Sequence, residues 1–114
     1  MLKILVVDDE KQARDNMIHC INVATNGFEI IGAAADGSEA LEMIRQTQPD
    51  IVLIDIQMPG ISGLDVIAEA RKEDLPVTFI IISSYSEFSF AQEAIRLGVF
   101  EYLCIRHRAF AIHP

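Results

Sequence analysis

The chain has 114 residues, a formal net charge of −8 and a hydrophobic content of 51%. This length suits one domain with a single packed core and excludes two. The acidic balance argues against nucleic-acid binding by the chain itself, because affinity for phosphate backbones comes from clustered Lys and Arg. No apolar run approaches the ~18 residues that a membrane span needs. Met1-Leu2-Lys3 leads directly into a strand, so we expect a cytoplasmic protein without a signal peptide.

Apolar runs of strand length alternate with segments of helical periodicity, a pattern typical of βαβ units around a parallel sheet. In chain order, the expected strands are Lys3–Val7, Glu29–Ala34, Ile51–Ile56, Val77–Ile82 and Glu101–Ile105. The expected helices are Lys11–Thr25, Ser38–Thr47, Gly63–Lys72 and Glu87–Leu97, with Ser38 as the N-cap of the second. Short connections with right-handed crossovers predict a doubly wound α/β fold with five parallel strands in the order 2-1-3-4-5.

Three aspartates end two of the expected strands. Asp8 and Asp9 follow the apolar run Ile4–Val7, and Asp55 follows the run Ile51–Ile54. The carboxyl ends of parallel strands share one edge of the sheet, so these side chains should meet where open α/β sheets bind ligands. Crowded carboxylates repel one another unless a cation lies between them, and oxygen ligands without His or Cys favour Mg²⁺. The alternative is that the three acids only cap the strand ends and the helices that follow.

A larger set of residues, taken in order, resembles the receiver domain of two-component response regulators, and the resemblance covers Leu2 to Leu103. Its motifs are Asp8-Asp9, Asp55, the turn Met58-Pro59-Gly60 with Gly63, Ser83 ending the fourth strand, and Tyr102 in the fifth. Segments 28–32 and 84–88 look most like receivers attached to AraC-type DNA-binding domains. The resemblance implies a flavodoxin-like receiver fold.

The resemblance also implies a phosphoacceptor function. Asp55 would accept a phosphoryl group from a sensor histidine kinase. Asp9 and Asp55, with the backbone carbonyl of Gln57, would hold Mg²⁺, and Asp8 would assist through water. Such a domain is a switch and not a dedicated enzyme, although it supports its own phosphotransfer and dephosphorylation. It would reach DNA only through an output domain that this chain lacks.

Two further residues would carry the switch by the same resemblance. Ser83 would turn its hydroxyl toward a phosphoryl oxygen, and Tyr102 would turn inward to fill the space that is left. Taken without the resemblance, Ser83 is also explained as a strand-end hydroxyl bonded to backbone. Tyr102 is likewise explained as a half-buried aromatic residue of a strand.

The chain departs from the family after Leu103. The family has a Lys that pairs with the phosphoryl group, followed by a Pro, whereas this chain has Ile105 and Arg106. We therefore divide it into a receiver domain at 1–105 and an atypical tail at 106–114, which is too short for the usual fifth helix. A missing or incomplete fifth helix would leave one apolar face of the sheet uncovered, so we expect self-association as a homo-oligomer.

Two other functions are compatible with parts of this pattern. A pseudo-receiver would act only as a protein-interaction surface, since the phosphoryl-pairing Lys is gone. A small hydrolase or phosphatase of similar fold would also use a strand-end Asp as its nucleophile. Such enzymes usually have a second Asp two residues later, and Gln57 at that position disfavours this alternative.

Overall fold

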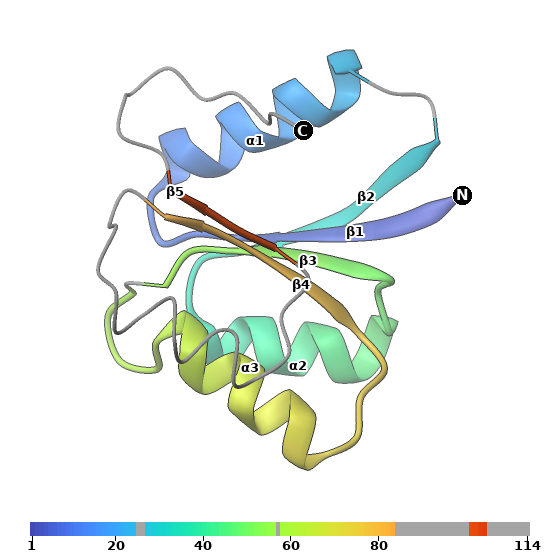
Figure 1. Cartoon of the computed structure of the whole chain (residues 1–114). Helices are drawn as coiled ribbons and strands as arrows, with labels where there is room; N and C mark the ends of the chain where they lie inside the picture. Colours follow the sequence, from blue (N-terminus) through green and yellow to red (C-terminus); the bar gives the residue numbers. More distant parts are fainter. Residues whose placement is uncertain (25–26, 57, 84–100, 105–114) are drawn as a thin grey trace.

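The computed structural model describes residues 1–24, 27–56, 58–83 and 101–104 (Figure 1). The expected helix Glu87–Leu97 and the tail at 106–114 lie outside the described residues. The loss of the fifth helix, the boundary between domain and tail, and the expected self-association therefore stay predictions.

The described chain alternates between strands and helices from its first residues. The strands are β1 (Leu2–Val7), β2 (Phe28–Ala34), β3 (Ile51–Ile54), β4 (Thr78–Ser83) and the short β5 (Glu101–Cys104). The helices are α1 (Lys11–Ala24), α2 (Gly37–Thr47) and α3 (Gly63–Lys72). Every strand pairing is parallel, and the strands lie in the order β2-β1-β3-β4, with β5 beyond β4. The predicted doubly wound α/β class and the order of the first four strands are confirmed.

Helices cover the sheet from both sides: α1 lies on one face, and α2 and α3 lie on the other (Figure 1). Alternate residues of β1 serve the two faces. Leu5 and Val7 pack in the larger cluster with α2 and α3, whereas Ile4 and Val6 pack with α1. Burial on both faces explains why this strand reads as an unbroken apolar run and not as an alternating one. Among the described helices, none is both long and apolar enough to cross a membrane.

The start of α2 differs from the sequence prediction. Asp36, and not Ser38, is the N-cap: its Oδ1 accepts a hydrogen bond from the Glu39 backbone N–H at 2.8 Å. The Glu39 side chain in turn accepts from the Ala35 N–H at 2.7 Å. An aspartate two positions earlier can satisfy the free N–H groups of the first turn equally well, so the helix gains Gly37 as its first residue.

The end of β3 also differs, because the ladder stops at Ile54 and not at Ile56. The Asp55 N–H still bonds to the Val7 oxygen at 3.1 Å, but the Ile56 oxygen accepts from the Gly63 N–H at 2.8 Å. The chain therefore turns toward α3 as soon as it passes Asp55.

Candidate metal centre

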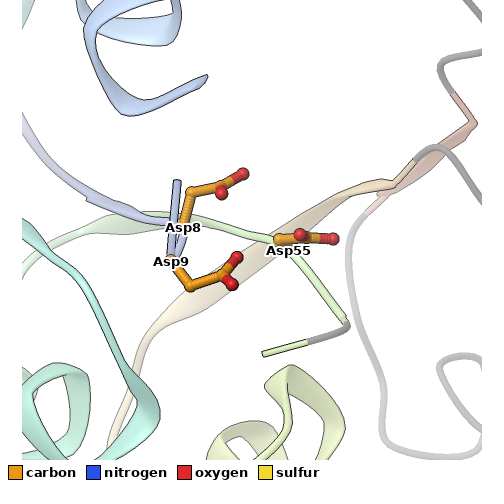
Figure 2. A group of neighbouring side chains, drawn as sticks. All are labelled: Asp8, Asp9 and Asp55. Carbon is orange, nitrogen blue, oxygen red and sulfur yellow. The ribbon is translucent and has the colours of Figure 1, made fainter. Parts of the chain in front are cut away.

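The candidate site lies at the carboxyl edge of the sheet, where β1 and β3 end side by side (Figure 2). Val7 and Ile54 are partners in the ladder, so Asp8 and Asp55 leave the sheet at the same level. One carboxylate oxygen from each of Asp8, Asp9 and Asp55 lies within 4.8 Å of the others. The structure therefore brings together the three aspartates that the sequence expects to meet.

Asp8 has the most restricted surroundings of the three acids. It is 8% exposed, whereas Asp55 is half-buried and Asp9 is exposed. Burial raises the pKa of Asp8 above its ordinary value. The hydrogen bond from the Glu10 N–H to Oδ1, at 2.9 Å, acts in the opposite direction, and the negative charges of Asp9 and Glu10 raise the pKa further. A bound cation stabilises a buried carboxyl group that lies beside other negative charges.

Arg14 of α1 reaches this edge of the sheet, but its described hydrogen bond goes to a backbone oxygen and not to a carboxylate. Its Nη1 donates to the backbone oxygen of Asp8 at 2.8 Å. This contact ties the first turn of α1 to the end of β1 without using the carboxylate of Asp8, which lies near those of Asp9 and Asp55 (Figure 2).

The donor set fits Mg²⁺. It consists of carboxylate oxygens, the hard ligands that Mg²⁺ prefers, and it supplies few enough of them for waters and a phosphoryl oxygen to complete an octahedral shell. Capping, the alternative explanation, accounts for one oxygen of Asp8, which accepts from the Glu10 N–H. It does not explain why carboxylate oxygens of Asp8, Asp9 and Asp55 lie within 4.8 Å of one another.

The other residues expected at the site are placed less completely. Gln57 and Ile105 lie outside the described residues. Ser83 is the last residue of β4, the neighbour of β3, so its backbone lies at the same edge of the sheet as the acids. Tyr102 pairs through its backbone with Ile81 in the β4–β5 ladder. The structure does not describe the side chains of Ser83 and Tyr102, and their roles stay predictions.

No structural role was assigned from the sequence to two glycines that begin helices near the site. Gly37 and Gly63 are the first residues of α2 and α3, and both are buried. One feature of the sequence could have indicated them. Each stands at the start of a helix, where residues with side chains are ordinarily tolerated and Gly is not required.

Fold and site together define a small doubly wound α/β domain whose acids cluster where open sheets of this kind bind ligands. The sequence matches the family model of the response regulator receiver domain over residues 4–105. The chain belongs to this family, which confirms the resemblance seen in its motifs.

Relatives of known sequence and structure agree with this assignment. "Uncharacterized transcriptional regulatory protein YesN" of Bacillus subtilis (strain 168) is 42% identical over 103 residues, which are 90% of this chain and 28% of that protein. The REC domain of AraT, a response regulator from Geobacillus stearothermophilus, is 40% identical with a TM-score of 0.80, covering 90% of this chain and 80% of that chain. A chain of the CheX-CheY-BeF3-Mg²⁺ complex from Borrelia burgdorferi is 25% identical with a TM-score of 0.84, covering 91% and 78%. The present chain spans between 28% and 42% of the length of such curated relatives.

Proposed function

We propose that this chain is the phosphoacceptor switch of a response regulator, and that Asp55 accepts a phosphoryl group from a sensor histidine kinase with the help of Mg²⁺. The observation that carries the proposal is the convergence of Asp8, Asp9 and Asp55 within 4.8 Å at the carboxyl edge of the sheet. The Mg²⁺ in the Borrelia burgdorferi complex supports the choice of ion.

Asp55 is the nucleophile in this proposal. An oxygen of its carboxylate attacks the phosphorus of a phosphohistidine, the P–N bond breaks, and the kinase imidazole leaves with the electron pair. The product is an acyl phosphate on Asp55. Asp9 and Asp55, with the backbone carbonyl of Gln57, would hold the ion directly, and Asp8 would hold one of its waters. Bound Mg²⁺ would offset the negative charge that accumulates when a phosphoryl group approaches carboxylates.

The proposed response to phosphorylation involves one residue of β4 and one of β5. We propose that the Ser83 hydroxyl binds a phosphoryl oxygen and that Tyr102 then turns inward. Ile105 has no hydrogen-bond donor on its side chain, so the phosphoryl group lacks the usual cationic partner at that position. We expect a weaker switch than in a receiver that carries the Lys.

The pseudo-receiver alternative differs in one respect, because it has no use for the metal. Three acids held together with a raised pKa at Asp8 are costly for a domain that never binds a cation. This is the argument for an active phosphoacceptor.

The proposed partners follow from the family and from the lengths of the relatives. The kinase is the phosphodonor, and it would meet this chain in the cytoplasm. Relatives more than twice as long have room for an output domain, through which the whole protein would bind DNA and regulate transcription. The chain itself would support only its own phosphotransfer and dephosphorylation, without acting as a dedicated enzyme, and self-association remains part of the proposal.

Acetyl phosphate tests the proposal without requiring the kinase. With Mg²⁺, intact-mass spectra should show one added phosphoryl group, which chelation of the metal and the variant Asp55→Asn should both abolish. Binding of Mg²⁺ without any phosphorylated species would favour the pseudo-receiver. If the chain is phosphorylated, Ile105→Lys should strengthen its structural response, and no gain would argue that Arg106 already pairs with the phosphoryl group.

A further inference from the structure

The first residues of α2 and α3 approach neighbouring backbone more closely than any residue with a side chain could. A β-carbon added to Gly63 would lie 2.2 Å from the backbone oxygen of Asp55 and 3.0 Å from the Cα of Ile56. A β-carbon added to Gly37 would lie 2.7 Å from the backbone oxygen of Ile61 and 2.8 Å from its Cβ. In both places the obstacle includes main chain, which yields less easily than the end of a flexible side chain.

These two approaches belong to a closed ring of contacts that passes through Asp8 and Asp55. The Asp8 N–H bonds to the Ala34 oxygen at the end of β2, at 3.1 Å. From Ala34 the chain runs to Gly37, which touches Ile61, and from Ile61 it runs to Gly63, which touches Asp55. The ring closes where the Asp55 N–H bonds to the oxygen of Val7, the residue before Asp8, at 3.1 Å.

Caps hold both helix starts in place within this ring. Asp36 accepts from the Glu39 N–H at the start of α2. At the start of α3, the Ser62 hydroxyl and the Asp65 carboxylate accept from each other's backbone N–H groups, both at 3.2 Å. The caps fix the position of each helix start, so the helix cannot easily move away from an added side chain. A larger residue in place of either glycine therefore displaces the neighbouring backbone.

We propose that Gly37 and Gly63 are positioning residues that set the spacing of the three carboxylates of the metal centre. A side chain at Gly63 would push the Asp55 backbone away from α3 and strain its bond to Val7. A side chain at Gly37 would displace Ile61 and, through it, the loop that connects Asp55 to α3. The consequence for Mg²⁺ rests on the proposed function, whereas the effect on the spacing of the acids does not.

The test compares Gly63→Ala and Gly37→Ala with two matched alanine variants. Gly60 lies in the same loop as Asp55 with φ of +77°, so Gly60→Ala is strained, but its β-carbon would meet nothing within 4 Å. Gly32→Ala places a β-carbon 2.4 Å from the end of the Met43 side chain, which is flexible and belongs to α2. The first control reproduces a loss of stability, and the second reproduces a close contact.

Two measurements are made at a temperature at which every variant is folded. Magnesium chloride titrations should show about 10- to 100-fold weaker binding in Gly63→Ala, the range typical of residues that support metal ligands, with a smaller loss in Gly37→Ala. Amide NMR spectra without metal should show displaced signals for Asp8, Asp9 and Asp55 in both variants. Both controls should keep the wild-type affinity and the wild-type signals of the acids.

Each alternative result has a defined meaning. Unchanged affinity in Gly63→Ala, or an equal loss in Gly60→Ala, would overturn the positioning role. If Gly63→Ala does not fold, Gly37→Ala decides by the same criteria. If the wild-type chain does not bind Mg²⁺, the proposed function fails, and the amide signals alone then decide whether the glycines set the spacing of the acids.

Discussion

Strand β3 has an aspartate at each end, and the two are used in opposite ways. Asp50, just before the strand, is exposed, and its Oδ2 accepts from the Lys3 backbone N–H at 2.7 Å. Its own N–H bonds to the Lys3 oxygen at 2.9 Å, and its oxygen accepts from the Thr78 N–H at 3.0 Å. Asp55, just after the strand, is half-buried and shares its surroundings with two more acids.

The comparison shows that an acid at a strand end is not by itself a functional signal. Asp50 joins the beginnings of three strands through backbone groups and needs no ion. At the other edge, Asp8 and Asp9 meet Asp55, and the burial of Asp8 makes their shared charge costly. The number of acids that meet, and their access to water, separate a structural carboxylate from a candidate ligand.

The largest difference should appear in phosphorylation. Asp55→Asn removes the nucleophilic oxygen and should abolish phosphorylation by acetyl phosphate, whereas Asp50→Asn should leave the rate near that of the wild type. Intact-mass time courses measure both. Equal labelling of wild type and Asp55→Asn would place the phosphoryl group elsewhere.

Metal binding should depend on the acids at the carboxyl edge of the sheet and not on Asp50 at the opposite edge. A ligand at ten times its Kd stabilises the fold by about 1.4 kcal/mol, so Mg²⁺ should raise the Tm of the wild-type chain measurably. Asp9→Ala should lose most of this rise, and Asp50→Ala should retain it. A thermal shift series with magnesium chloride gives the comparison. A wild-type Tm that does not change with Mg²⁺ would contradict metal binding at the three acids.

Asp8→Asn should raise the Tm of the metal-free chain, a change smaller than the loss expected for Asp9→Ala and opposite in sign. Because the pKa of Asp8 is raised in the fold, the folded chain holds this proton more tightly than the unfolded chain does. This contribution to stability is therefore present at low pH and is lost as the pH rises from ~3.9 through the folded pKa. Asp8→Asn keeps the acceptor for the Glu10 N–H and should raise the metal-free Tm at neutral pH, most clearly above that window. A lower Tm for Asp8→Asn at neutral pH, measured by calorimetry, would show that the ionised carboxylate stabilises the fold.

The smallest expected change lies at the opposite edge. Asp50→Ala removes the exposed bond to the Lys3 N–H and should lower the free energy of unfolding by about 0.5 kcal/mol, the lower end for a single hydrogen bond. Urea denaturation measures it. A loss of several kcal/mol would mean that Asp50 does more than join the strand beginnings.

Local patterns in the sequence were enough to predict the strands, their parallel order through β4 and the meeting of Asp8, Asp9 and Asp55. Parallel strands bring their carboxyl ends to one edge whatever the details of packing, so residues that follow two central strands must approach each other. The motifs around Asp55 were enough to indicate the receiver family.

Other features were decided only by the tertiary structure. The N-cap at Asp36 in place of Ser38 and the register shift of β2 opposite Ile4 and Leu5 depend on how the second strand and helix meet β1. The burial of Asp8 and the contacts of Gly37 and Gly63 arise only when segments that are separate in the sequence pack together. Periodicity records which face a residue occupies but not how closely two backbones approach, and that distance exists only once the layers have packed.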